Sequence, residues 1–190
     1  MNKLNYDQVK NDIEKARDEG AEFIIVCPHW GKEYALYVNE YQKYWTKIFF
    51  ELGVNLVIGT HPHVIQQVKI IVDKKNKNKR MYIFYSLGNF INATSSRGKN
   101  VFHRFLGGMA HVILEKDGNN KVIIKELKFI PLITHINIDK KVTTFKVKDY
   151  NREMAEKNYV GIEYDRTFSY DLMIDTFKKV TDEKFLDFNL

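Results

Sequence analysis

The stretch Val57–Val64, which reads VIGTHPHV, constrains the fold of this chain more than any other. Its apolar start is typical of a buried strand, and Gly59 ends that strand. Pro62 fixes its own φ and disfavours the α region for the residue before it, so we expect an extended segment. Residues i and i+2 of an extended segment point to the same side. His61 and His63 are therefore predicted to present both imidazoles to one volume beyond a strand end.

A second strand end carries another histidine. The apolar run Glu22–Cys27 is predicted to be a buried strand, and it leads into the loop Pro28–Tyr34, which contains His29. A helix capped by Asn5 precedes this strand, and an aromatic helix over residues 37–52 follows it. The order helix, strand, helix, strand favours parallel strands joined by a crossover helix. Ligands collect beyond the carboxyl ends of such strands, so we expect all three imidazoles to converge.

The rest of the chain is richer in predicted strands. A hairpin is expected from residues 65–72 and 81–85, a second from 108–115 and 122–129, and a last strand over 142–147. Beyond residue 150 the sequence becomes helical, with Ile174, Phe177 and Val180 as the apolar face. We expect residues 1–135 to form one domain. Residues 136–190 are either part of that domain or a helical appendage.

Composition limits the partners. With 190 residues, 44% of them hydrophobic and 28% charged, the chain can form one domain with a core. Much of the net charge of +6 lies in the run 74–80, which indicates a solvated turn. No aromatic residues interleave these cations, so nucleic-acid or anionic-surface binding is the less favoured interpretation.

No window is apolar enough to span a membrane, and residues 1–20 lack the apolar region of a signal peptide. The chain alone is therefore expected to be soluble. Its single cysteine, Cys27, is expected to be a buried filler that forms no internal disulfide.

Three histidines suit a divalent transition metal such as manganese, zinc or iron better than magnesium or calcium, which prefer oxygen ligands. Packing or hydrogen bonding is the alternative role for these histidines. Each ligating imidazole needs a partner on its other nitrogen, for which Glu33 and Asn89 are candidates. Arg97 and Arg104 follow Asn89 and could clamp an anionic substrate, or they are exposed loop charges. The three other histidines have no second histidine at a matching strand end, and we expect them to be structural or on the surface: His103, His111 and His135.

Three blocks together resemble a known family. Residues 28–34 (PHWGKEY), 57–64 (VIGTHPHV) and 85–90 (YSLGNF) are similar to the HWGxEY, GxHPHV and YSLGNF blocks of the CapA/PgsA family of bacterial capsule (poly-γ-glutamate) synthesis proteins. That family is related to the calcineurin-like metallophosphoesterases. The resemblance extends from the first helix to about Pro131.

The resemblance implies an α/β fold, namely the C-terminal part of a metallophosphoesterase-like β sandwich with flanking helices, followed by a helical extension. It implies that His29, His61 and His63 are metal ligands and that His29, His61 and Asn89 belong to the catalytic set. Glu33, Arg97 and Arg104 are assigned to substrate binding, the substrate being an anionic polymer or a phosphoester. Family members are usually membrane-anchored and extracytoplasmic.

The chain also departs from the family pattern. The family's further metal ligands, an early aspartate, a Gly-Asp and an Asn-His pair, have no counterpart before His29. The metal site is therefore expected to be incomplete, and the metal could be absent. The missing half, or self-association through an exposed sheet, is the expected partner. The resemblance implies a metal-dependent hydrolase or transferase acting on a phosphoester or amide bond. The alternatives are a non-catalytic accessory or scaffold module and an unrelated α/β binding domain.

Overall fold

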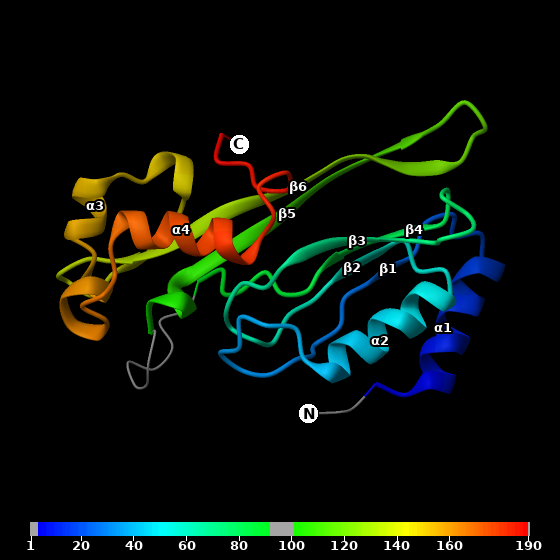
Figure 1. Cartoon of the computed structure of the whole chain (residues 1–190), viewed down its shortest axis with the longest axis horizontal. Coiled ribbons are helices and arrows are strands. Elements are labelled where there is room, and N and C mark those ends of the chain that lie inside the picture. The colour runs from blue at the N-terminus through cyan, green and yellow to red at the C-terminus, as the bar shows by residue number, and fades with distance from the viewer. Residues whose placement is uncertain (1–3, 92–100, 190) are drawn as a thin grey trace.

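The computed structural model describes residues 4–91 and 101–189 as two β-sheets with flanking helices (Figure 1). In chain order the elements are α1 (Tyr6–Asp18), β1 (Ile25–Val26), α2 (Glu40–Glu51), β2 (Leu56–Ile58), β3 (Val68–Val72), β4 (Arg80–Phe84), β5 (Leu106–Lys116), β6 (Val122–Ile136), β7 (Val142–Lys146), α3 (Arg152–Glu156) and α4 (Tyr170–Val180). Short 3₁₀ turns at Val101–Phe105 and Val147–Asp149 and a π-helical turn at Val160–Tyr164 complete them. The predicted α/β class is confirmed.

The first sheet has the strand order β1-β2-β4-β3. Its strands β1 and β2 are parallel, as are β2 and β4, while β3 and β4 form an antiparallel hairpin. The predicted parallel strands with a crossover helix, α2, and the first predicted hairpin are therefore confirmed. Since β1, β2 and β4 are mutually parallel, the loops that follow them meet at the same edge of the sheet.

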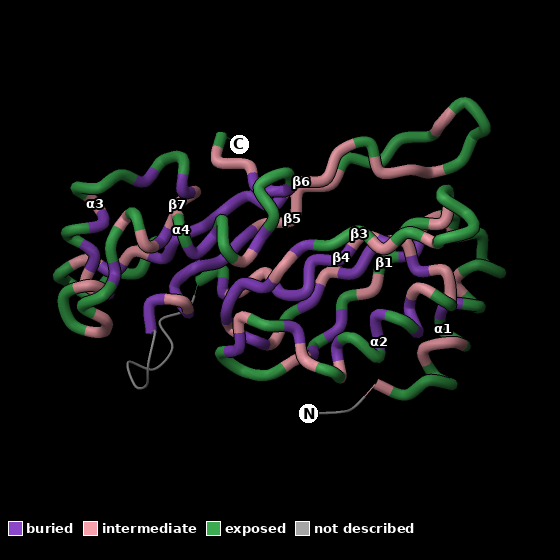
Figure 2. Tube along the Cα trace, viewed as in Figure 1, coloured by how far each residue is buried: buried purple, intermediate pink, exposed green. Residues whose placement is uncertain are grey.

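The two faces of this sheet pack into different hydrophobic cores. Leu56 and Phe84 lie in one buried cluster, which continues into the second sheet and the C-terminal helices. Val57 and Ile83, the neighbouring residues on the same strands, lie in the other cluster with residues of α1 and α2. This alternation follows from the period of two in a β-strand. The central strands are buried on both sides, as the purple segments in Figure 2 show.

The second sheet is antiparallel, with the order β5-β6-β7, and the second predicted hairpin and the last predicted strand are both present. Its central strand β6 runs to Ile136, so residue 135, the predicted end of the first segment, lies within a strand. Met173 and Phe177 of α4 share one core with Leu56 and Phe129. Residues on both sides of position 135 therefore contribute to the same hydrophobic core.

The burial predicted for Cys27 is wrong, and the predicted aromatic helix is buried only in part. Cys27 follows the edge strand β1 and is exposed rather than buried, and Ile25 on that strand is 47% exposed. In the aromatic stripe, Trp45 and Phe49 are buried, but Tyr37 and Tyr44 are each 61% exposed. Tyr37 precedes the helix, which begins only after the Asn39 cap. No helix in the described part of the chain is both long and apolar enough to cross a membrane.

Candidate metal centre

His29 and His61 come together because their strands are neighbours. The pairing of β1 with β2 continues past both strands as a parallel bridge between His29 and Thr60. Trp30 N–H donates to Thr60 O (3.0 Å), and Thr60 N–H donates to Pro28 O (3.0 Å). The two imidazoles then lie side by side, with 3.0 Å between His29 Nε2 and His61 Nδ1. The predicted convergence of histidines at adjacent strand ends is found.

The segment from His61 to His63 is a turn, so the prediction of an extended segment is wrong. His61 has a φ of +101° and His63 one of +57°. A hydrogen bond from Tyr34 N–H to Pro62 O (2.7 Å) contributes to this arrangement. Such φ values are costly for non-glycine residues, and they cluster at functional sites. The turn still places the two rings near each other, with 6.2 Å between their centroids.

Glu33 joins these two histidines. Ligand atoms of Glu33, His61 and His63 all lie within 4.8 Å of one another. Glu33 is exposed in the same loop as His29, between Gly31 (φ +98°) and Tyr34 (φ +62°). Glu33 is predicted to bind substrate or to support an imidazole, yet the geometry places it among the donor atoms. Its position only four residues after His29, at the same strand end, was the available signal.

Asn89 determines which ring nitrogen of His63 carries the proton. Its Nδ2–H group donates to His63 O (3.2 Å) and to Arg104 O (2.8 Å), which leaves Oδ1 as an acceptor. His63 Nδ1 lies 2.9 Å from that oxygen, so Nδ1 carries the proton and Nε2 keeps its lone pair. This is the carbonyl-oriented imidazole that metal ligands require. Asn89, predicted as catalytic, is buried at 8% exposure and contacts the imidazole rather than standing free.

Of the two arginines predicted to bind substrate, Arg97 lies outside the described residues. Arg104 is buried at 6% exposure, so its alternative interpretation as an exposed loop charge is wrong. Its guanidinium carbon lies 3.9 Å from the centre of the Tyr34 ring. Tyr34 in turn lies beside His63, with ring centroids 6.1 Å apart. A permanent cation is therefore fixed close to the histidine turn.

The surroundings of His61 favour its neutral form. Burial lowers the pKa of His61, and the neighbouring His29 lowers it further, while Glu33 acts in the opposite direction. A neutral imidazole has the free lone pair that a metal ion needs. The electrostatic environment of His61 thus agrees with a ligand role.

A buried amide pair supports the loop from behind, and sequence reasoning did not identify it. Gln42 Nε2–H donates to Gln66 Oε1 (2.8 Å), while Gln66 Nε2–H donates to Ala35 O and Tyr37 O (both 2.8 Å). Both glutamines are fully buried. The one signal in the sequence was Gln42 on the inner face of an aromatic helix, since buried polar groups need partners.

Two imidazoles and one carboxylate suit a single divalent transition ion, as in mononuclear zinc and iron sites. Donor atoms around such an ion lie roughly 3–3.5 Å apart, so the observed cluster is slightly wider than a closed site. His29 lies beside the cluster, against His61. The residues present therefore fit one ion, which Glu33, His61 and His63 would hold with His29 adjacent.

The fold and the site define an α/β protein with a candidate metal centre at the carboxyl ends of parallel strands. Residues 1–94 match the family described as "Bacterial capsule synthesis protein PGA_cap". Over that stretch the chain is similar to this family of CapA-like capsule synthesis proteins. The match ends before Pro131, where the resemblance was expected to end.

Two relatives agree with this assignment. The capsule biosynthesis protein CapA of Bacillus anthracis is 34% identical over 91 residues, which are 46% of this chain and 20% of that protein. The PGA biosynthesis protein CapA of Bacillus subtilis (strain 168) is 32% identical over 71 residues, which are 37% of this chain and 17% of that protein. The aligned part of the chain thus spans a fifth or less of these relatives.

Proposed function

We propose that this chain supplies a divalent transition-metal centre, holding manganese, zinc or iron, to a CapA-like protein of capsule synthesis. The observation that carries the proposal is the convergence of Glu33, His61 and His63, whose ligand atoms lie within 4.8 Å of one another. The orientation of His63 by Asn89 and the lowered pKa of His61 support it.

We further propose a hydrolysis or transfer reaction on a phosphoester or amide bond. A bound divalent ion polarises a phosphoryl or carbonyl oxygen and lowers the pKa of bound water. The chain's own residues position the candidate ligands: Asn89 contacts and orients the ring of His63, and His29 contacts the ring of His61. The buried cation of Arg104 packs on Tyr34, which lies beside His63, and would favour an anionic substrate there. The relatives' names refer to capsule and PGA biosynthesis, which makes a capsule polymer the proposed setting.

A non-catalytic accessory module is the second candidate. One observation favours it: Glu33 is the only carboxylate in the described cluster, whereas a pair of ions needs several. In that case the centre would hold one ion as a structural element. An activity that depends on both the metal and added polypeptide from a longer relative would favour the enzyme.

The partner and the location are likewise proposals. One edge of β1 pairs with no described strand, and Ile25 on it is exposed, which supports a partner strand from another part of a longer protein or from a second copy. The family resemblance supports an extracytoplasmic, membrane-anchored setting.

The test is the metal content of the purified, untagged chain, measured by plasma mass spectrometry after reconstitution with zinc or manganese. We expect about one ion per chain in the wild type and almost none in His61→Ala/His63→Ala. A His111→Ala variant is the matched control, because His111 lies on β5, where its Nε2 is 3.5 Å from Glu126 Oε1. No metal in the wild type, or equal loss in the control, would overturn the proposal. Phosphodiester and γ-glutamyl substrates then test the reaction.

A further inference from the structure

The opposite end of the first sheet carries a basic cleft. Two adjoining cavities, of about 280 and 430 Å³, share Asn55, Asn78, Arg80 and Lys121 among their lining residues. Asn55 precedes β2 and Arg80 begins β4, so the cleft lies at the amino ends of these parallel strands. Asn55 is four residue steps, roughly 13 Å of extended chain, from Gly59, where the histidine loop begins.

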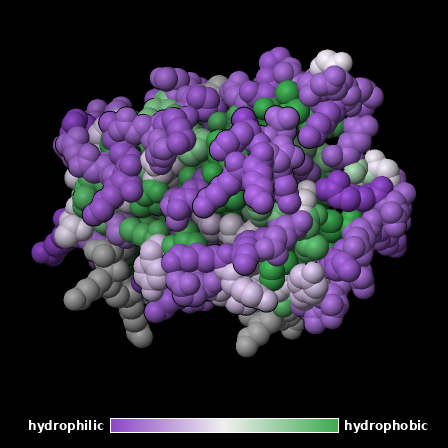
Figure 3. Space-filling view, turned by 45° about the vertical axis from the view of Figure 1, so that its right-hand side comes forward, coloured by the Kyte–Doolittle hydropathy of each residue, from purple (hydrophilic) through white to green (hydrophobic). Residues whose placement is uncertain are grey.

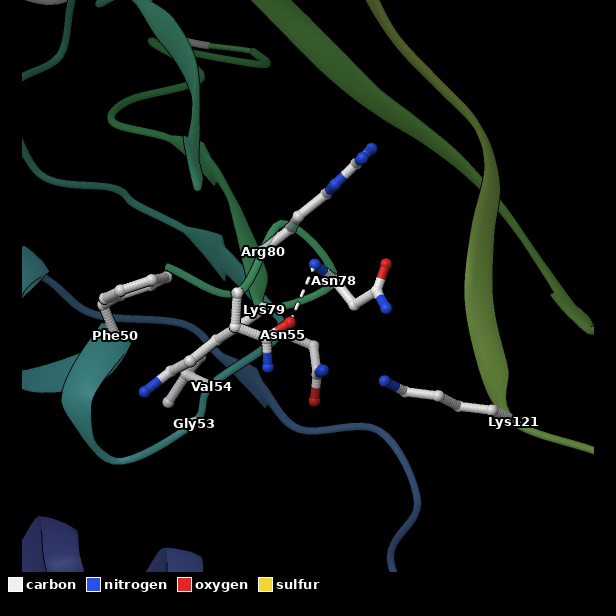
Figure 4. Close-up of a pocket in the computed structure, with 9 residues that line it drawn as sticks. Phe50, Gly53, Val54, Asn55, Asn78, Lys79, Arg80 and Lys121 are labelled. Carbon is white, nitrogen blue, oxygen red and sulfur yellow. Dashed lines mark hydrogen bonds between the residues drawn. The ribbon is translucent and has the colours of Figure 1, made fainter. Parts of the chain in front are cut away.

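The walls of the cleft come from distant parts of the chain. One wall is the turn between β3 and β4, and the other is the turn between β5 and β6, from which Lys121 extends its ammonium group toward Asn55 (Figure 4). Asn55 is held in place because its Oδ1 accepts from Ile24 N–H (2.8 Å). Its Nδ2–H group is therefore the part of the amide that remains to donate into the cleft.

The charges of the cleft are unbalanced. Lys79, Arg80 and Lys121 line it, and none of the three forms an ion pair with a described residue. The acid in its lining is Asp117, whose Oδ1 is used by the backbone N–H groups of Asn119 and Lys121. Lys79 lies over Phe50, with 4.8 Å from its Nζ to the ring centre, and Arg80 Nε–H donates to Lys77 O (2.9 Å). Two of the cations are thus positioned by the protein itself.

We propose that this cleft binds an oxyanion group, carried on a phosphate- or carboxylate-bearing ligand. Lysine ammonium groups, an arginine guanidinium and an amide N–H group are the donors that such groups accept from. The combined volume suits a small ligand or one end of a longer one. The lysine-rich run at 74–80, for which a solvated turn was the favoured interpretation and anionic-surface binding the less favoured one, supplies one wall of the proposed site. The site is independent of the histidine centre.

The test is a titration of the metal-free, ¹⁵N-labelled chain with inorganic pyrophosphate and, separately, with citrate, followed by NMR. We expect the amide signals of Asn55, Asn78 and Lys121 to shift for at least one ligand. The affinity of the variant Lys121→Ala/Arg80→Ala for the anion should fall by about tenfold or more, because two charged donors are lost. Response to one anion alone identifies the chemical class of the ligand.

Lys141→Ala is the matched control. Lys121 and Lys141 occupy equivalent positions in two hairpin turns: each donates its N–H to the side-chain oxygen four residues earlier, in Asp117 and Asn137. Loss of one cation at Lys141 should leave binding unchanged. Equal weakening by Lys141→Ala would show non-specific attraction to a basic protein and overturn the proposal, as would the absence of shifts in the cleft. His61→Ala/His63→Ala should bind normally, which separates this site from the metal centre.

Discussion

At the scale of single residues, the candidate centre depends on an exceptionally close contact at Gly59. A Cβ atom there would lie 2.2 Å from Tyr85 O and 2.4 Å from Trp30 Nε1. These two atoms form the hydrogen bond from the Trp30 indole to Tyr85 O (2.9 Å), which fixes the residue after His29. The identity of one small residue therefore decides whether the strand ends can approach each other.

We expect Gly59→Ala to lower the free energy of unfolding by about 2 kcal/mol or more, because a methyl group would displace both the backbone and the indole. Urea denaturation measures the change. Gly118→Ala is the control, since nothing lies within 4 Å of its added Cβ. Equal effects of the two substitutions would contradict the packing argument.

A histidine outside the metal centre should make stability depend on pH. Burial lowers the pKa of His135 below its ordinary value near 6.5, so the unfolded chain takes up this proton more readily than the folded chain. The stability from neutral His135 is complete above about pH 6.5 and is lost as the pH falls toward the lowered pKa. Urea midpoints at pH 7.5 and 5.5 should differ less in His135→Gln than in the wild type. An unchanged difference would show that His135 does not contribute.

At the scale of elements, the loop between β1 and α2 is held by a buried amide rather than by apolar packing alone. Gln66 contacts both Gln42 of α2 and two carbonyl groups of the loop. The loop carries His29 and Glu33, so its shape determines the spacing of the candidate donor atoms. The position of a helix is thus coupled to the geometry of the site.

We expect Gln66→Met to lower the free energy of unfolding by about 2–4 kcal/mol, because it leaves buried polar groups without partners. It should also weaken zinc binding, measured by competition with a chromogenic chelator. Gln67→Met, at the next position and only partly buried, should change neither quantity appreciably. Full metal affinity in a folded Gln66→Met chain would show that the loop keeps its shape without the amide.

At the scale of the whole molecule, the first sheet ends in an open edge. Strand β1 is hydrogen-bonded to β2 alone among the described strands, and Ile25 on it is 47% exposed. Figure 3 shows a face on which hydrophobic side chains lie uncovered among hydrophilic ones. Unpaired edges and exposed apolar groups favour association with another strand.

We expect the isolated chain to self-associate as its concentration rises, and Ile25→Lys to reduce this association, because a charge on an edge strand opposes strand pairing. Light scattering across a concentration series measures both. Ile138→Lys is the control, since Ile138 is 81% exposed in the turn between β6 and β7. A strictly monomeric wild type at all concentrations would contradict the expectation.

Much of this organisation could be predicted from local sequence. The Asn5 cap, the crossover helix, both hairpins and the strand-end positions of His29, His61 and His63 follow from periodicity, capping and turn residues. Apolar strands alternating with a helix favour parallel pairing, and parallel pairing brings the loops after the strands to one edge. The sequence by itself thus determined the α/β class and the meeting of the histidines.

Only the tertiary structure decided the remaining features. The turn at His61, the place of Glu33 among the donor atoms and the buried Gln42–Gln66 pair all depend on contacts between segments remote in sequence. Exposure of Cys27 depends on β1 being an edge strand, and the basic cleft depends on the turn before β6 reaching the start of β4. The physical reason is the same in each case. Periodicity and propensity predict the local backbone conformation of a segment, whereas burial and the convergence of side chains depend on which other segments pack against it.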